Sequence, residues 1–269
     1  MVITSLLGLL FLFGEEPDRR VALPGGAVLV LPADRSLAGP IDRVVHLHGA
    51  VATVERALDE SGWRAAVVVV NEPGLSSAYA RPFRDPKRFP ALLDEATQAL
   101  RSALPGVQPE KGRLIVSSFS AGFGGVRELL GQEDTFNQID ALILADSLYC
   151  GYEGDPALRI VDPGKMAGFR RFAMQAADAR KAMLVSHCFL VPEGYASTAE
   201  TADDLVRHVG GAFETANEDW AEGWHLSRRF QRGRLVLLGF EGEDGEDHLR
   251  HLRRLGTLWR ELPEVSVGR

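Results

Sequence analysis

The sequence predicts an α/β fold, a doubly wound and mostly parallel sheet of about eight strands with helices on both faces. The first observation behind this is a set of short, almost uninterrupted apolar runs, which are typical of strands buried on both faces. The runs are AVLVL at 27–31, DRVVHLH at 42–48, AAVVVV at 65–70, RLIVS at 113–117, DALILA at 140–145, AMLVS at 182–186 and GRLVLLG at 233–239.

The second observation is that helix-like segments separate these runs. In such segments apolar residues recur at helical spacing, so that one face is apolar. They cover residues 51–62, 90–104, 123–131, 164–180, 199–213 and 247–262. Strands that alternate with helices favour a parallel sheet, and the functional groups of such a sheet gather at the carboxyl ends of its strands.

The third observation is the composition. The chain has 269 residues, of which 45% are hydrophobic and 25% charged, as expected for a globular protein with one large domain. Its net charge of −7 disfavours nucleic acid as the main partner, because binding phosphates requires a positive face. Two cysteines, Cys150 and Cys188, exclude a disulfide framework and a cysteine-rich zinc site. Whether these two thiols pair depends on the compartment, and both states stay open.

The N-terminal segment 1–14 begins with the apolar run MVITSLLGLLFLF. This run is too short to cross a bilayer as a helix, so we expect no integral membrane span. It is either the apolar part of a secretory signal, in which case the protein is exported, or a first buried strand of a cytoplasmic protein. We expect residues 15–269 to form a single domain, with a lid or insertion at the polar stretch 192–224.

The candidate nucleophile follows the run at 113–117. Here the sequence Ser118-Phe119-Ser120-Ala121-Gly122 leads into a helical segment. A strand, a tight turn of small residues and a helix form the setting of a nucleophile elbow, G-x-S-x-G. Ser120 is the central serine, and Ser118 stands where glycine is usual. The helix N-terminus behind Ser120 would favour developing negative charge on a bound oxygen.

The same glycines also suggest a dinucleotide-binding turn. Gly122 and Gly124 fit the start of G-x-G-x-x-G/A, but Arg127 occupies the position that requires glycine or alanine. The sequence has no G-x-x-x-x-G-K-[ST] motif either. Nucleotide binding is therefore disfavoured, and we expect no cofactor.

A second functional turn, His46-Leu47-His48-Gly49-Ala50, follows the run at 42–48. The two histidines point to one face of a strand and could bind zinc, but no further ligand follows closely, so we expect no metal site. His46 is interpreted as an interior histidine. The backbone N–H groups of the turn are interpreted as part of an oxyanion hole.

Two carboxylates are candidates for the acid that orients a histidine. Asp146 directly follows the run at 140–145, and an aspartate at the end of a buried strand requires a binding partner. Glu193 lies beyond the run at 182–186 and is the alternative. We favour Asp146.

The candidate base lies in the last helical segment. His248 shares a helix face with Leu252, Leu255 and Trp259, which predicts that it points inward. His251 lies about 80° away on the helix, at roughly 100° per residue, and is the reserve candidate.

The chain order is therefore Ser120, an acid and then His248, and in this order the sequence resembles the α/β-hydrolase superfamily. The resemblance is carried by the His48-Gly49 turn, the elbow around Ser120 and the terminal helix, and it covers most of residues 25–262. The chain departs from the family at Ser118 and in the acid, which follows the sixth strand rather than the seventh.

The resemblance implies a serine hydrolase that cleaves an ester or amide bond through an acyl-enzyme intermediate. His248 would accept the proton of Ser120, and Asp146 would orient His248. The oxyanion would be held by backbone N–H groups of three residues: Gly49, Ala50 and Ala121.

The substrate would be a small-molecule or peptidic acyl compound. A carboxylic ester is favoured, and an amide or peptide is also compatible with the mechanism. The alternative is a non-catalytic binding module on the same scaffold, which the departure at Ser118 leaves open.

Overall fold

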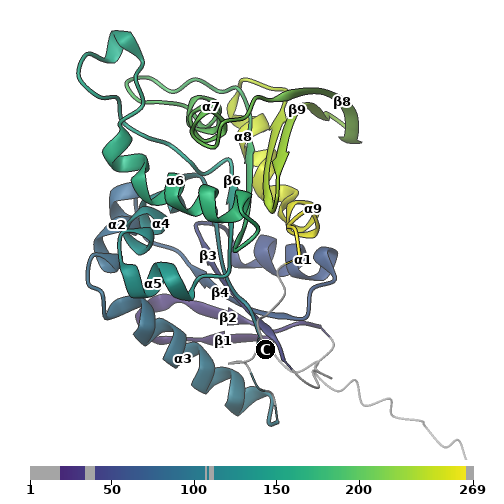
Figure 1. Cartoon of the computed structure of the whole chain (residues 1–269). Coiled ribbons are helices and arrows are strands. Elements are labelled where there is room, and N and C mark those ends of the chain that lie inside the picture. Colours follow the sequence, from purple (N-terminus) through teal and green to yellow (C-terminus); the bar gives the residue numbers. More distant parts are fainter. Residues whose placement is uncertain (1–18, 34–39, 107, 109–111, 265–269) are drawn as a thin grey trace, which may run out of the picture.

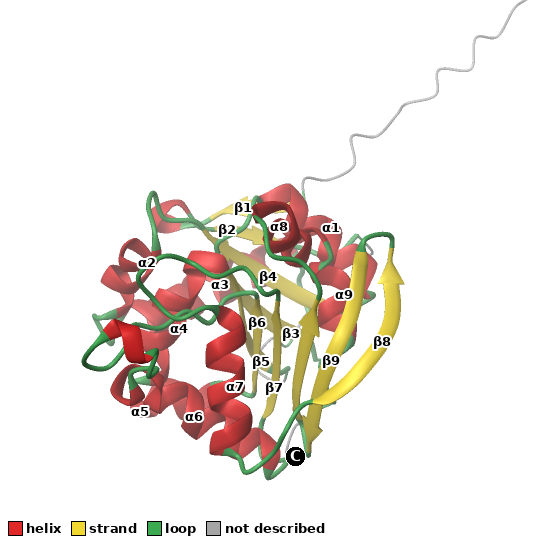
Figure 2. Ribbon diagram, turned by 90° about the horizontal axis from the view of Figure 1, so that it is seen from above, coloured by secondary structure: helices red, strands yellow, loops and turns green. Residues whose placement is uncertain are grey.

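A mixed, mostly parallel sheet forms the centre of the molecule (Figures 1 and 2). The computed structural model describes residues 19–33, 40–106, 108 and 112–264. Within these residues the sheet has ten strands in the order β1-β2-β4-β3-β5-β6-β7-β10-β9-β8. The strands are β1 (Arg20–Ala22), β2 (Val28–Val30), β3 (Asp42–Leu47), β4 (Ala65–Val70), β5 (Leu114–Phe119), β6 (Ala141–Ala145), β7 (Ala182–His187), β8 (Glu214–Ala221), β9 (Trp224–Arg232) and β10 (Leu235–Phe240).

The six central strands, from β4 to β10 in sheet order, are parallel to one another. β2 pairs with β4 in the antiparallel direction, and so do β9 with β10 and β8 with β9. Every residue of the central strands from β4 to β7, apart from the start of β3, is buried, because helices cover both faces. The apolar runs of the sequence therefore predicted the central sheet correctly.

Helices cover the two faces of the sheet in two groups (Figure 2). One face packs against α1, α8 and α9, which contact one another, and the other packs against the group from α2 to α7. The helices are α1 (Val51–Ser61), α2 (Ser76–Phe83), α3 (Arg88–Ala103), α4 (Phe123–Leu130), α5 (Glu133–Gln138), α6 (Pro163–Ala177), α7 (Thr198–His208), α8 (Gly245–Arg253) and α9 (Leu255–Arg260). The α/β fold that the sequence predicts is confirmed.

The outer elements are where the structure adds to the prediction. β1, α2 and α5 were not predicted, and the single helix expected at 247–262 is divided into α8 and α9 at Arg254. The stretch 192–224, interpreted from the sequence as a lid or insertion, contains a loop, α7 and β8. β8 and β9 form a hairpin on the edge of the sheet, and every residue of β8 is exposed or half-buried, which explains its polar sequence.

The expectation for residues 1–14 lies outside the described residues. Among the residues that are described, no helix is both long and apolar enough to cross a membrane.

Candidate active site

The turn after β5 holds the candidate nucleophile. Ser120 has a φ of 47°, a left-handed conformation that a non-glycine residue rarely adopts. It begins a short 3-10 turn, Ser120–Gly122, which leads directly into α4. Strained backbone of this kind is concentrated at functional sites, and it is the geometry expected of a nucleophile elbow.

Glycines allow this turn to fit against its neighbours. A Cβ atom on Gly122 would lie 2.4 Å from the carbonyl oxygen of Leu47 in β3, and one on Gly124 would lie 2.0 Å from the carbonyl oxygen of Ser76 in α2. Both distances are far below a permissible contact, so these positions exclude every side chain. The turn is thus held between the end of β3 and the first residue of α2.

Ser118, which stands where the G-x-S-x-G pattern has glycine, is buried and hydrogen-bonded. Its buried hydroxyl lies 2.8 Å from Ser147 Oγ, and Ser147 Oγ donates a hydrogen bond of 2.9 Å to the carbonyl oxygen of Ser120. The first serine of the motif is therefore connected, through Ser147, to the backbone of the candidate nucleophile.

The end of β6 supplies the acid. Asp146 is fully buried, and one of its carboxylate oxygens, Oδ2, lies 2.6 Å from His248 Nδ1. The same oxygen accepts a hydrogen bond of 3.0 Å from the thiol of Cys188, and the other oxygen accepts one of 3.2 Å from the Cys188 backbone N–H. Thr198 at the start of α7 donates a further hydrogen bond to Oδ1. Four donors thus satisfy the buried carboxylate.

These contacts keep Asp146 ionised. Burial by itself raises the pKa of Asp146, but the hydrogen bond from His248, the attraction of His251 and His248, and the hydrogen bond from Cys188 outweigh it and lower the pKa below its usual range. A charged carboxylate beside Nδ1 fixes the tautomer of His248, because Nδ1 then carries the hydrogen. Nε2 of His248 is left for another partner.

His248 is held in place by the start of α8 and by aromatic rings. Asp244 and Asp247 form a reciprocal capping box at the N-terminus of this helix. The imidazole of His248 stacks on Phe119, with ring centroids 4.6 Å apart, and the Tyr149 hydroxyl lies 3.5 Å from its Nδ1. Because Phe119 precedes Ser120 directly, this stacking places the imidazole beside the elbow.

Ser120 and His248 border the same cavity, which has a volume of about 480 Å3. Among the described residues no hydrogen bond joins the Ser120 hydroxyl to His248. Catalytic hydrogen bonds are often long without substrate and shorten when it binds. The cavity is lined mainly by apolar and aromatic side chains, including Leu75, Phe123, Tyr149, Leu190 and Tyr195.

The two reserve candidates lie elsewhere. Glu193 is exposed in the loop between β7 and α7, and no hydrogen bond or ion pair joins its side chain to a histidine of the described residues. His251 is fully buried, and its Nδ1 lies 2.8 Å from Ser186 Oγ. Burial lowers the pKa of His251 to about 4, so it is neutral at physiological pH.

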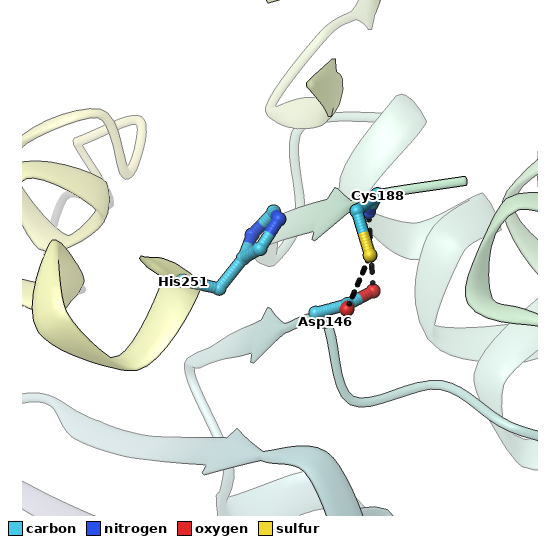
Figure 3. Close-up of side chains that lie close together, drawn as sticks. All are labelled: Asp146, Cys188 and His251. Carbon is cyan, nitrogen blue, oxygen red and sulfur yellow. Dashed lines mark hydrogen bonds between the residues drawn. The ribbon is translucent and has the colours of Figure 1, made fainter. Parts of the chain in front are cut away.

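His251 does lie close to Asp146 and Cys188 (Figure 3). One ligand-type atom from each of these side chains falls within 4.8 Å of the others, a spacing that would suit a metal ion if the thiol were deprotonated. Burial and the charge of Asp146 raise the pKa of the Cys188 thiol, which therefore keeps its proton and donates it to Asp146. The donor set fits a hydrogen-bonded cluster around a carboxylate better than a metal centre, which requires a thiolate.

Of the three residues predicted to supply oxyanion donors, only one lines the cavity. Ala121 lines the cavity. The Gly49 N–H instead donates a hydrogen bond of 3.0 Å to Asn71 Oδ1, and Asn71 Nδ2 donates one of 2.8 Å back to the Gly49 carbonyl oxygen. Ala50 is exposed and does not line the cavity. Of the three donors, the structure brings only Ala121 to Ser120.

The sequence also singled out His46, His48 and the two cysteines, and each of them contacts neighbouring residues in the fold. His46 is fully buried with Nδ1 3.0 Å from Ser117 Oγ, as expected for an interior histidine. His48 has a φ of 71° and lies 2.6 Å from the Tyr79 hydroxyl. Cys150 and Cys188 are both free and buried; Cys150 lines the cavity and Cys188 contacts Asp146.

Several residues around the site could not be recognised in the sequence. Thr198 and Cys188 carried no signal beyond a helix start and a strand end, and Asn71 and Ser147 follow strands without belonging to any motif. A polar residue directly after a buried parallel strand was the only available clue.

Comparison with known proteins identifies similar folds but no close relative. No family model matches this chain, and no curated protein matches it. An uncharacterised protein from Capnocytophaga ochracea superimposes with a TM-score of 0.47 at 11% identity, over 89% of this chain and 61% of that protein. This chain therefore spans 61% of the length of that protein.

Two further solved structures cover nearly whole chains. A cold-adapted esterase from an Arctic intertidal metagenomic library gives a TM-score of 0.44 at 13% identity, over 91% of this chain and 92% of the esterase. An α/β hydrolase superfamily protein from Enterococcus faecalis gives 0.44 at 9% identity, over 92% of this chain and 100% of that protein. With its mixed, mostly parallel sheet and helices on both faces, the chain has an α/β-hydrolase-like fold.

Proposed function

We propose that this protein is a serine hydrolase that cleaves a carboxylic ester, or an amide, through an acyl-enzyme intermediate. The observation that supports this most strongly is the combination of the Asp146–His248 hydrogen bond with a cavity that both His248 and the strained Ser120 border. A binding module that had lost its catalytic function would not need an ionised, fully satisfied carboxylate behind a histidine.

The mechanism follows from these positions. Ser120 Oγ attacks the substrate carbonyl while its proton passes to Nε2 of His248, and the positive charge that forms on the imidazole is stabilised by Asp146. The negative charge on the carbonyl oxygen is stabilised by the N–H of Ala121 at the start of the 3-10 turn. The leaving group takes the proton from His248, and water then hydrolyses the acyl-enzyme by the same steps in reverse order.

The direct test is labelling with a fluorophosphonate probe, combined with hydrolysis of a panel of 4-nitrophenyl esters. We expect the wild-type protein to be labelled and to hydrolyse esters, and Ser120→Ala to lose both properties. Ser77→Ala is the matched control, because Ser77 is exposed at the start of α2 and does not line the cavity. Labelling that persists in Ser120→Ala would exclude Ser120 as the nucleophile, and a wild-type protein that neither reacts nor turns over would favour the binding module.

A further inference from the structure

The cavity that contains Ser120 and His248 has an asymmetric charge. Two of its lining side chains are cationic, Arg127 in α4 and Lys165 in α6, and among the described residues no Asp or Glu lines it. Asp146 is separated from the cavity because it is fully buried behind His248. The hydrolysis mechanism uses neither Arg127 nor Lys165, so their presence in this cavity requires another explanation.

Arg127 has hydrogen-bond donors available for a ligand. Within the described part of the chain its guanidinium makes no hydrogen bond, and its ion-pair contact is Glu128 at 3.7 Å. Glu128 also lies 3.8 Å from Arg84, so its single charge is shared between two guanidinium groups. The Arg127 guanidinium lies 6.0 Å from the centre of the Phe123 ring, another lining residue, which holds it over the cavity wall.

Lys165 is partly engaged and still retains donors. Its ammonium group lies 2.8 Å from Asp162, which also caps α6 by accepting hydrogen bonds from the N–H groups of Gly164 and Lys165. An ammonium group has three N–H bonds, so this pairing leaves two of them for other acceptors. Gly151 makes room for the group, since a Cβ atom there would lie 2.9 Å from Lys165 Nζ.

The two cations line one cavity. Arg127 and Lys165 share its wall with Cys150 and Gly151, and the Lys165 ammonium group lies close to Gly151. Counting Arg84, Arg127 and Lys165 against Glu128 and Asp162 gives three positive and two negative charges, hence one net positive charge in this group. A single positive charge matches one carboxylate better than a doubly charged phosphate monoester.

We propose that the substrate is an ester that carries a carboxylate, which Arg127 and Lys165 bind while the scissile carbonyl lies at Ser120. This inference rests on the proposed serine-hydrolase function and adds a substrate class to it. The guanidinium of Arg127 matches a carboxylate with two parallel hydrogen bonds, and Lys165 adds a further charge. The aromatic and aliphatic lining between these groups accommodates a short apolar spacer.

The test compares charged esters with their uncharged counterparts. Mono-4-nitrophenyl glutarate carries the carboxylate on the acyl side, and its methyl ester removes only the charge. The butyrate ester of 4-hydroxybenzoate carries it on the leaving-group side, with the butyrate ester of methyl 4-hydroxybenzoate as its counterpart. We expect the wild-type protein to prefer the charged member of one pair by about tenfold in kcat/KM, or about 1.4 kcal/mol. The pair that shows the preference identifies which side of the ester binds the cations.

Variants then assign the preference to the two cations. Arg127→Gln should reduce the charged-to-neutral ratio to near one, Lys165→Met should reduce it about threefold, and Arg127→Lys should keep part of it. Arg171→Gln is the matched control, because it removes one positive charge from the exposed side of α6, the helix that carries Lys165, without lining the cavity, and it should leave the ratio unchanged. Thermal melting of each variant checks that it is folded.

The outcomes separate this inference from the proposed function. Turnover of all four esters with a wild-type ratio near one would overturn the carboxylate subsite and leave the serine hydrolase intact. A tenfold ratio that Arg127→Gln, Arg127→Lys and Lys165→Met all preserve would also overturn it. No turnover of any ester, together with no fluorophosphonate labelling, would overturn both proposals.

Discussion

His248 Nδ1 lies 2.6 Å from Asp146 Oδ2, although 102 residues separate the two in the chain. The sheet order explains how they meet, because β6, which Asp146 directly follows, is separated from β10 by β7 alone. The helix that follows β10 starts at the carboxyl end of the sheet and carries His248 back over β6. An acid after the sixth strand therefore reaches the terminal histidine.

The first prediction concerns Asp146→Asn. Each oxygen of Asp146 accepts two hydrogen bonds, so an NH2 group in place of one oxygen would face hydrogen-bond donors instead of acceptors. The uncharged amide would also no longer fix the tautomer of His248. We expect kcat to fall on the order of 10^4-fold, as in serine hydrolases that lose this carboxylate. Ester hydrolysis under saturating substrate measures the change.

A control for this variant lies at the other end of the same strand. Asp140 precedes β6 and accepts a hydrogen bond of 2.8 Å from the Leu114 N–H. Asp140→Asn should lower stability slightly and keep kcat within a factor of about two, since a single surface-side hydrogen bond contributes about 1 kcal/mol. Equal losses of kcat in Asp140→Asn and Asp146→Asn would contradict the assignment of Asp146.

The second prediction concerns the packing of the elbow. In Gly122→Ala the new methyl group would lie 2.4 Å from the Leu47 carbonyl oxygen, so either β3 or the turn must shift. We expect a loss of unfolding free energy of about 2 kcal/mol or more, with loss of fluorophosphonate labelling. Gly131→Ala, at the other end of α4, is the control, because its nearest neighbour would lie 3.4 Å away. Urea denaturation of both variants decides; an unchanged midpoint for Gly122→Ala would refute the close approach.

The third prediction concerns Ser118 and Ser147. Ser147→Ala leaves the buried Ser118 hydroxyl and the Ser120 carbonyl oxygen without this partner, so we expect a stability loss of about 1–3 kcal/mol. Ser118→Ala removes only one hydrogen bond and should cost about 1 kcal/mol. The double variant should lose less than the sum of the two, as measured by urea denaturation in a double-mutant cycle. Strict additivity would show that the two hydroxyl groups are not coupled.

The fourth prediction concerns stability against pH. Burial lowers the pKa of His46 and of His187 to about 3, and that of His251 to about 4. In the unfolded chain these side chains have an ordinary pKa of about 6.5. Below that pH these histidines bind protons in the unfolded state but stay neutral in the folded state. Their contribution to the free energy of unfolding is therefore fully present above pH 6.5 and is lost as pH falls towards 4.

Each histidine contributes a slope of about 1.4 kcal/mol per pH unit within this window. Urea midpoints between pH 7.5 and pH 4.5 should therefore decline steeply. His46→Asn should give a shallower decline, because it removes one of the three buried histidines. A midpoint that stays constant from pH 7.5 to pH 5 would show that these imidazoles are not protected from protons.

Part of the fold could be predicted because buried parallel strands carry a local signal. The runs that became β3 to β7 and β10 are apolar on both faces, and this pattern does not depend on which strands become neighbours. The hairpin of β8 and β9 was missed, since an edge with one exposed side permits polar residues and resembles a loop in sequence.

For the candidate site, the sequence by itself identified the residues of the proposed triad: Ser120 in a turn that tolerates only small neighbours, Asp146 at a strand end and His248 on an inward helix face. Only the tertiary structure decided what these side chains contact. In that structure the Gly49 N–H donates a hydrogen bond to Asn71, and Thr198 and Cys188 donate hydrogen bonds to Asp146. Arg127 and Lys165 line the same cavity. The physical reason is range: conformation and burial are encoded within a few residues, whereas hydrogen-bond partners are set by how distant segments pack.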